Sequence, residues 1–161
     1  DSVKENIFNI ISHSNLIKVN IKQSNVLDLY SGVGSFGIEC LSRGSKNVTF
    51  VDADKQAIKL IKKNLDQIPV GEKTLVFDGK IEKFFNSKHK NSKFDIIFFD
   101  PPFNDIQYTD YLNLIKKFKI YSPIHIVIIH RDRKTNENLD KFIKILDTKN
   151  YGRSKIIFGL F

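Results

Sequence analysis

The sequence contains no tryptophan, no methionine and only one cysteine among its 161 residues, which excludes an internal disulfide. Cys40 lies at an apolar position of a predicted helix, and we expect it to pack in the core. No apolar run is long enough for a membrane helix, and no secretory segment is visible. The four histidines show no metal-ligand spacing. His130, at the end of a predicted strand, could approach a cleft there, but the preferred interpretation is a surface or capping residue. We therefore expect a cytoplasmic protein without a bound metal.

Positive charge exceeds negative charge in this chain. The 26 lysines and arginines against 18 aspartates and glutamates give a formal net charge of +8, which favours a polyanionic partner such as RNA. Arg131 and Arg133 follow a predicted strand, and we expect them to meet phosphates at the mouth of a cleft. A group of lysines is instead interpreted as a solvated face. Its members are Lys80, Lys83, Lys88, Lys90 and Lys93.

Strand and helix patterns alternate along the whole chain. Strands are predicted at residues 25–30, 47–52, 73–77, 94–99, 124–129 and 154–161, and helices at residues 35–43, 55–65, 81–85, 108–118 and 139–146. This repetition predicts an α/β fold, a Rossmann-like, doubly wound and mostly parallel sheet in a three-layer αβα sandwich. The length fits a single domain over residues 1–161, with an N-terminal helix or cap over residues 1–20 and a Rossmann-like core over residues 21–161.

A glycine-rich segment follows the first predicted strand and opens the next helix. Gly32, Gly34 and Gly37 match the pattern G-x-G-x-x-G, in which the first two glycines permit a tight turn close to a ligand. Gly37 lets the following helix pack near the strand, and Ser35 is predicted to cap that helix. Because a strand precedes the pattern and a helix follows it, a nucleotide-containing ligand is favoured here.

Acidic residues accompany the glycine segment. Asp52 ends the second predicted strand, about twenty residues after the first glycine, which is the spacing that places an acid beside a bound ribose. Asp54 is interpreted as the cap of the next helix. These features suit a nicotinamide cofactor and S-adenosylmethionine equally well. Asp28, inside the first predicted strand, favours S-adenosylmethionine, because its carboxylate suits a cationic sulfonium with its amino-acid tail better than a pyrophosphate. Asp28 could also only tie down the loop backbone.

The segment Asp100-Pro101-Pro102-Phe103 directly follows the predicted strand at residues 94–99. Two consecutive prolines fix two backbone torsions and remove two donors, so the Asp100 carboxylate and neighbouring carbonyls are held in a preset geometry. The ring of Phe103 offers a surface on which a base can stack. Taken alone the segment could be only a stiff turn, but beside the glycine segment it indicates a site for an exocyclic amine of a nucleobase.

The order of these motifs resembles that of class I S-adenosylmethionine-dependent methyltransferases that act on exocyclic amines, and is most similar to the bacterial 16S rRNA guanine-N2 methyltransferase family. The segment at residues 1–9 also resembles that family's stretch before the core, where a helix helps to close the cofactor pocket. The resemblance implies that S-adenosyl-L-methionine is held by Asp28, Tyr30, Gly32, Gly34 and Asp52. It implies that the base is held by Asp100, Pro101, Pro102 and Phe103.

The chain departs from that family's pattern at two places. It starts without an initiator methionine and without the basic segment that family members usually carry, so we expect it to be a fragment. After the third predicted strand the family tends to have an acid and a small residue at an adenine-facing turn, where this chain has Lys80 and Ile81. Asp78 lies slightly earlier and is our candidate for the adenine contact.

These observations predict methyl transfer to the N2 amine of a guanine in 16S rRNA, either as free RNA or in an assembling particle, by a monomer. The Asp100 carboxylate and the Pro101 carbonyl would accept hydrogen bonds from the amine as its nitrogen becomes pyramidal, and Phe103 would stack on the base. The final proton acceptor, Asp100 or water, stays open. The alternatives are an adenine-N6 methyltransferase on DNA or RNA, a nicotinamide-dependent oxidoreductase, and a catalytically silent RNA-binding module.

Overall fold

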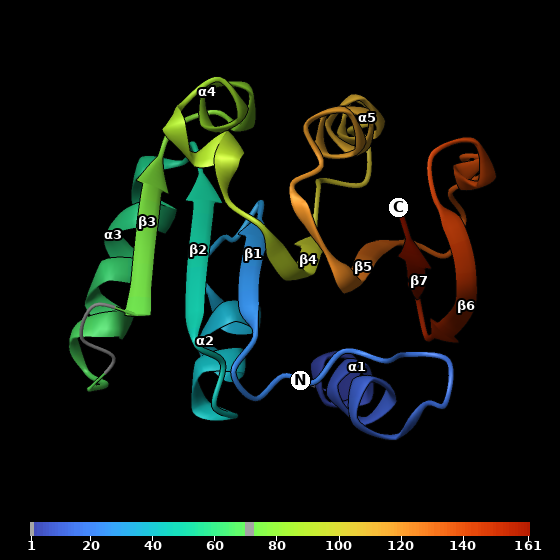
Figure 1. Ribbon diagram of the computed structural model, residues 1–161, viewed down its shortest axis with the longest axis horizontal. Coiled ribbons are helices and arrows are strands. Elements are labelled where there is room, and N and C mark those ends of the chain that lie inside the picture. The colour runs from blue at the N-terminus through green and yellow to red at the C-terminus, as the bar shows by residue number, and fades with distance from the viewer. Residues whose placement is uncertain (1, 70–72) are drawn as a thin grey trace.

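The computed structural model describes residues 2–69 and 73–161. The described chain forms a seven-stranded sheet with the strand order β3-β2-β1-β4-β5-β7-β6 (Figure 1). The strands are β1 (Asn25–Leu29), β2 (Asn47–Asp52), β3 (Thr74–Asp78), β4 (Phe94–Phe99), β5 (Tyr121–Asp132), β6 (Lys144–Tyr151) and β7 (Ser154–Leu160). The first five are parallel, whereas β7 runs antiparallel to both of its neighbours.

Helices cover both faces of the sheet, which confirms the predicted Rossmann-like αβα sandwich. They are α1 (Ser2–His13), α2 (Ser35–Ser42), α3 (Lys55–Asp66), α4 (Ile81–Phe85) and α5 (Tyr108–Phe118), with short 3-10 turns η2 (Lys88–Asn91) and η3 (Leu139–Lys141). Buried side chains of α1, α2 and α3 join one core cluster, and those of α4 and α5 join the other. Because successive strand residues point to opposite faces, Val26 packs with the first cluster and Leu27 with the second. The central strands therefore appear in the sequence as nearly continuous apolar runs.

Gly37 lets α2 lie directly on β2. A Cβ atom at this position would be 2.4 Å from Cε1 of Phe50 and 2.7 Å from Cγ1 of Val48, distances that real side chains do not reach. The predicted role of Gly37 in close helix packing is confirmed. Cys40, one turn later in α2, is fully buried in the same cluster, as predicted.

The predicted helix at residues 139–146 is wrong. Only Leu139–Lys141 form a 3-10 turn, and Lys144–Tyr151 form the edge strand β6, which pairs with β7. The hairpin between them turns at Gly152, whose φ is +56°. Apolar residues at helical spacing over so short a run also fit a strand, and the pairing with β7, which no local pattern shows, decides between the two.

The other boundaries differ by a few residues. The fifth strand begins three residues before the predicted range of 124–129 and ends three residues after it, because β7 gives its last residues a pairing partner. None of the described helices is long and apolar enough to cross a membrane.

Candidate active site

The two motifs come together at one edge of the sheet. In the register of the parallel strands Leu29 pairs with Val51 on one side and with Phe99 on the other. The next residues of the three strands, Tyr30, Asp52 and Asp100, therefore reach the same carboxyl edge. Ligands of open α/β sheets bind in the crevice outside this edge.

Three hollows open at this edge, and Tyr30 lines all of them. The glycine-loop hollow is lined by Val3, Lys4, Ile7, Asp28, Tyr30, Ser31, Gly32, Val33, Ser35, Phe36, Phe98, Asp100 and His130. The proline-loop hollow is lined by Tyr30, Gly32, Asp52, Asp54, Ala57, Asp100, Pro101, Pro102 and Phe103. The β3-side hollow is lined by Tyr30, Val51, Asp52, Ala53, Gly79, Lys80, Ile81, Glu82, Asp105 and Tyr111. Tyr30 reaches these hollows from a left-handed backbone conformation, with φ of +56° at the end of β1.

Helix α1 closes one side of the glycine-loop hollow, with Lys4 and Ile7 in its wall. The helix is anchored by Phe8, which is fully buried and stacks on Phe36 with ring centroids 5.2 Å apart. Phe36 in turn stacks on Phe98 at 4.1 Å. These contacts place the first helix where the resemblance to the methyltransferase family implied that a helix would lie.

Asp28 is a buried carboxyl group in the glycine-loop hollow. Its side chain is 1% exposed, and its Oδ2 accepts a hydrogen bond of 3.1 Å from the Gly37 backbone amide. Burial raises the pKa of Asp28 well above its ordinary value, and the negative charges of Asp100 and Asp52 add to this, while the Gly37 amide lowers it. A cationic group in the hollow would stabilise the ionised carboxylate.

The glycine loop offers free polar groups to a ligand. Oγ of Ser31 is buried and has no hydrogen-bond partner in the described part of the chain. A Cβ atom built on Gly32, whose φ is +55°, would meet nothing within 4 Å, so the backbone here faces open space. A buried hydroxyl without a partner is costly, and a polar ligand would satisfy it.

Asp52 connects the glycine loop after β1 with the loop after β2. Its Oδ2 accepts from the Gly32 backbone amide at 2.8 Å, and its Oδ1 accepts from the Asp54 amide at 2.8 Å. A carboxylate has about four acceptor sites, so the group retains capacity for ribose hydroxyls. Asp54 accepts from the backbone amides of Gln56 and Ala57, which confirms its predicted role as the cap of α3. The predicted cap at Ser35 is wrong, because Gly34 occupies the cap position of α2 and no side chain caps this helix.

The carboxylate of Asp78, the candidate adenine contact, lies 2.9 Å and 3.0 Å from Nζ of Lys55. The β3-side hollow is instead lined by the following residues, Gly79, Lys80 and Ile81. Glu82 and Asp105 also line it and were not anticipated from the sequence. Their distance in sequence from the glycine pattern does not indicate a binding site, because only folding brings α4 and the loop before α5 together at the β3-side hollow.

The proline loop presents Asp100 and Phe103 to the cleft. The Asp100 side chain is 45% exposed, and Phe103 is 43% exposed. Nδ1 of His130 lies 2.9 Å from Oδ1 of Asp100, and Nε2 of the same ring lies 2.8 Å from Oγ of Ser154. The rings of His130 and Phe103 pack edge to face, with their centroids 5.6 Å apart. The preferred interpretation of His130 as a surface or capping residue is therefore wrong, and the alternative, that it approaches the cleft from the end of β5, is confirmed.

The prediction that Arg131 meets phosphates at the cleft mouth is wrong. It is 1% exposed and is held beneath the proline loop by hydrogen bonds and by the ring of Tyr108. Arg133, two residues further along, is exposed. The strand ends at Asp132, so Arg131 lies inside β5 beneath the proline loop, whereas Arg133 lies in the exposed turn that follows.

Comparisons with known proteins agree with this architecture. The model of a family described as "Conserved hypothetical protein 95" matches residues 1–159. Ribosomal RNA small subunit methyltransferase D of Haemophilus influenzae is 37% identical over 105 residues, which are 65% of this chain and 51% of that protein. The protein of the same name from Buchnera aphidicola is 30% identical over 135 residues, which are 84% of this chain and 65% of that protein. The matches thus span between about half and two thirds of these relatives.

A solved structure shows the same fold. The structure of a conserved hypothetical protein from Streptococcus pyogenes superposes with a TM-score of 0.83 at 22% identity, covering 98% of this chain and 95% of that chain. Among the described residues no group of three or more histidine, cysteine or acidic side chains is arranged to hold a metal ion.

Proposed function

Because the chain belongs to the family described as Conserved hypothetical protein 95, we propose that it transfers a methyl group from S-adenosyl-L-methionine to the exocyclic N2 amine of a guanine in small-subunit ribosomal RNA. One observation carries the proposal. The glycine-loop hollow and the proline-loop hollow share Tyr30, Gly32 and Asp100, so a donor in the first lies next to an acceptor in the second. The names of the relatives supply the class of acceptor, which is ribosomal RNA.

We propose that the donor site consists of Asp28, Tyr30, Gly32, Gly34 and Asp52, with Asp78 as the adenine candidate. Asp28, Tyr30 and Gly32 line the glycine-loop hollow, and Asp52 lines the two neighbouring hollows. When bound, S-adenosylmethionine supplies an electrophilic methyl group on a sulfonium centre. Asp28 would face the cationic end of this ligand, and the remaining acceptor sites of Asp52 would hold the ribose. Ser31 would satisfy its buried hydroxyl on the same ligand.

We propose that Asp100, Pro101, Pro102 and Phe103 form the acceptor site. The amine of guanine is a weak nucleophile, because its lone pair is delocalised into the ring. The Asp100 carboxylate and the Pro101 carbonyl would accept hydrogen bonds from the amine and stabilise the positive charge that develops on it. Phe103, with its exposed ring, would stack on the base. Most of the rate enhancement would come from holding the two reactants in contact.

The nicotinamide alternative is disfavoured by Asp28, because a buried carboxylate beside the glycine loop would repel a pyrophosphate. We propose that the protein acts as a single-domain monomer in the cytoplasm, where ribosomal RNA is made and assembled in bacteria. Assays with free RNA and with an assembling particle, run side by side, would identify which of the two is methylated.

Calorimetric binding of S-adenosylhomocysteine tests the donor site. We expect the native chain to bind, Asp52→Ala to lose binding, and Asp66→Ala, at an exposed position near the end of α3, to bind normally. Circular dichroism must show that Asp52→Ala is folded, because its carboxylate also holds two backbone amides. A folded native chain that binds NAD and not S-adenosylhomocysteine would favour the oxidoreductase.

Transfer of labelled methyl groups to small-subunit rRNA tests the acceptor site. Asp100→Ala should lower the transfer rate by on the order of 100-fold, the usual effect of removing one preorganised polar group, while it still binds S-adenosylhomocysteine. Asp66→Ala again serves as the matched control. Full activity of Asp100→Ala would refute the proposed role of the carboxylate. A native chain that binds RNA and the cofactor without transfer would be a silent binding module.

A further inference from the structure

We propose that Arg131, supported by Glu137 and Tyr108, is a positioning residue that fixes the proline loop for methyl transfer. The proposal rests on the proposed function and extends it to residues outside the motifs. It starts from a buried charge. Arg131 lies next to the last residue of β5 and is 1% exposed, and an arginine is almost never buried to this extent unless its donors are paired.

The partners of Arg131 include two carbonyl groups of the proline loop. One terminal nitrogen donates to the Pro102 carbonyl at 3.2 Å, and the other donates to the Phe103 carbonyl at 3.0 Å. Prolines remove backbone donors from this loop, so it cannot be held by joining a strand ladder. The guanidinium fork supplies two donors in a fixed plane instead, and it thereby sets the direction of two successive peptide groups.

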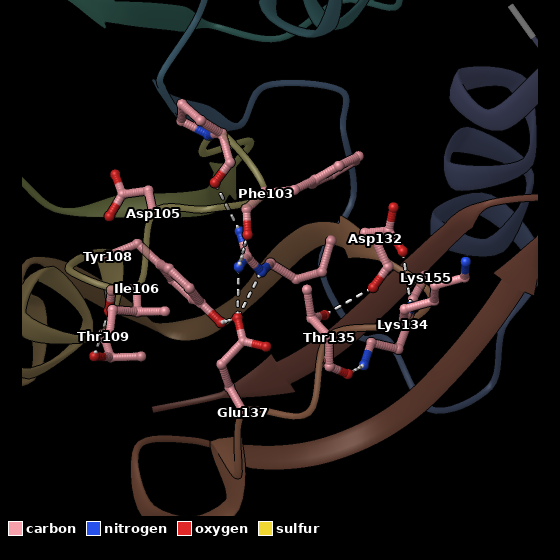
Figure 2. Close-up of polar contacts among 12 residues, drawn as sticks. Phe103, Asp105, Ile106, Tyr108, Thr109, Asp132, Lys134, Thr135, Glu137 and Lys155 are labelled. Atoms are coloured by element: carbon pink, nitrogen blue, oxygen red, sulfur yellow. Dashed lines mark hydrogen bonds and ion pairs between the residues drawn. The ribbon is translucent and has the colours of Figure 1, made fainter.

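A second layer holds the guanidinium group itself. Nε of Arg131 donates to Oε1 of Glu137 at 2.8 Å, and the same oxygen accepts from the Tyr108 hydroxyl at 2.9 Å. The guanidinium carbon lies 4.6 Å from the centroid of the Tyr108 ring. Figure 2 shows Phe103, Tyr108 and Glu137 close together, although they come from three different segments. Each of the three contacts Arg131.

The titration of Glu137 agrees with this geometry. Burial alone raises the pKa of Glu137, but its own backbone amide, the Tyr108 hydroxyl and Arg131 together lower it below the ordinary value. Glu137 is therefore ionised at neutral pH and balances the buried positive charge. Burial and then the contact with Glu137 raise the pKa of Tyr108, which keeps its hydroxyl protonated as a donor.

The turn after β5 brings Glu137 back to Arg131. Oγ1 of Thr135 donates to the Asp132 carbonyl at 2.7 Å, and Nζ of Lys155 in β7 donates to the Thr135 carbonyl at 2.6 Å (Figure 2). The Lys134 amide donates to Oδ1 of Asp132 at 2.8 Å. The turn is thus anchored to the antiparallel pair of β5 and β7, and this pair provides a rigid support for the network.

His130 and Arg131, which are neighbours near the end of β5, contact different parts of the proline loop. His130 contacts the carboxylate of Asp100 and the ring of Phe103, whereas Arg131 takes the carbonyls of Pro102 and Phe103. In the described structure no protein donor reaches the carbonyl of Pro101. That carbonyl is therefore left as the backbone acceptor that the proposed reaction needs beside Asp100.

The substitution Arg131→Lys provides the test, because it keeps the charge and loses the planar fork. We expect Arg131→Lys to lower kcat by on the order of 10- to 100-fold, the effect of misplacing reacting groups by about 1 Å. The KM for S-adenosylmethionine and the Kd of S-adenosylhomocysteine should stay within about twofold, because Arg131 does not line the glycine-loop hollow. Arg153→Lys, at an exposed position in the turn between β6 and β7, is the matched control and should match the native chain.

Hydrogen–deuterium exchange of residues 103–107 gives a readout that does not depend on activity. The Asp105 amide donates to the Pro102 carbonyl at 2.9 Å, so a loosened loop should exchange faster there, while the amides of β1 and β4 keep their protection. Glu137→Gln, which keeps an acceptor oxygen but loses the charge, should show the same pattern with a smaller loss of kcat, and it replaces Arg131→Lys if that variant does not fold.

Native kcat or unchanged loop exchange in a folded variant would overturn the proposal. A parallel loss of S-adenosylhomocysteine binding and of protection throughout the sheet would also overturn it, since Arg131 would then support the fold as a whole. If the native chain methylates no RNA, the proposed function fails instead, and the exchange measurement still decides whether Arg131 holds the loop.

Discussion

Replacement of Asp28 by Asn should stabilise the ligand-free protein at neutral pH and weaken cofactor binding. The carboxyl group is 1% exposed, and its burial raises its pKa well above the ordinary value near 4. A raised pKa in the folded state means that the folded protein holds this proton more tightly than the unfolded chain does. The stability contributed by the protonated group is fully present below the unfolded pKa and is lost as pH rises through the folded pKa.

The size of the effect follows from the pKa shift. Each unit by which folding raises the pKa of Asp28 costs about 1.4 kcal/mol once the group is ionised. The free energy of unfolding of Asp28→Asn, relative to the native chain, should therefore increase with pH from about pH 4, at up to about 1.4 kcal/mol per pH unit, until Asp28 has ionised in the folded state. The amide keeps an oxygen that can accept from Gly37, so this hydrogen bond is retained.

Urea unfolding of both chains at several pH values between 4 and 8 measures this difference. Asp95→Asn makes the same chemical change at a half-buried carboxylate of β4 and controls for the amide itself. S-adenosylhomocysteine keeps the cationic ammonium group of the amino-acid tail, and it should bind Asp28→Asn on the order of 10- to 100-fold more weakly, because hydrogen bonds to charged groups contribute about 1.5–3 kcal/mol. A stability difference that does not change with pH, together with native affinity, would refute both the buried titration and the cationic site.

Three further predictions concern the supports of the site. Gly37→Ala should lower the free energy of unfolding by about 1–3 kcal/mol, because the new Cβ meets Phe50 at 2.4 Å, and urea unfolding would measure it; an unchanged midpoint would contradict the close packing. Phe8→Ala should cost about 3–5 kcal/mol and weaken binding of S-adenosylhomocysteine, since Phe8 anchors α1 against the hollow; calorimetry showing native affinity would contradict a role for α1 in closing it. Asp78→Ala should change stability by less than about 1 kcal/mol, because its ion pair is exposed, so calorimetry on this variant isolates its role as an adenine contact; native affinity would exclude that role.

The parts of the fold and site that local patterns determine were predictable. The apolar runs of β1 and β4, the glycines after β1 and the prolines after β4 each act within a few residues, so strand ends and loops could be located from the sequence alone. The capping of α3 by Asp54 is local in the same way. Parallel strands then place the loops that follow them at one edge, which brought the two motifs together.

The parts that depend on distant pairing were not predictable. The strand β6 exists because β7 pairs with it, and its own residues also fit a helix. His130 was interpreted as a surface or capping residue and Arg131 as a phosphate contact at the cleft mouth, because the pairing that sets the length of β5 is not visible in the sequence. Only the folded chain shows that one of them reaches Asp100 and that the other lies buried under Pro102 and Phe103.

The most direct test of the central claim is identification of the nucleoside methylated by this chain. Small-subunit rRNA and a matched pair of guanine-only and adenine-only oligonucleotides would be incubated with labelled S-adenosylmethionine, digested and separated by mass spectrometry. We expect N2-methylguanosine from the native chain, and on the order of 100-fold slower formation of it by Asp100→Ala that still binds S-adenosylhomocysteine. Label in N6-methyladenosine, or no label in any RNA from a chain that binds the cofactor, would contradict the account.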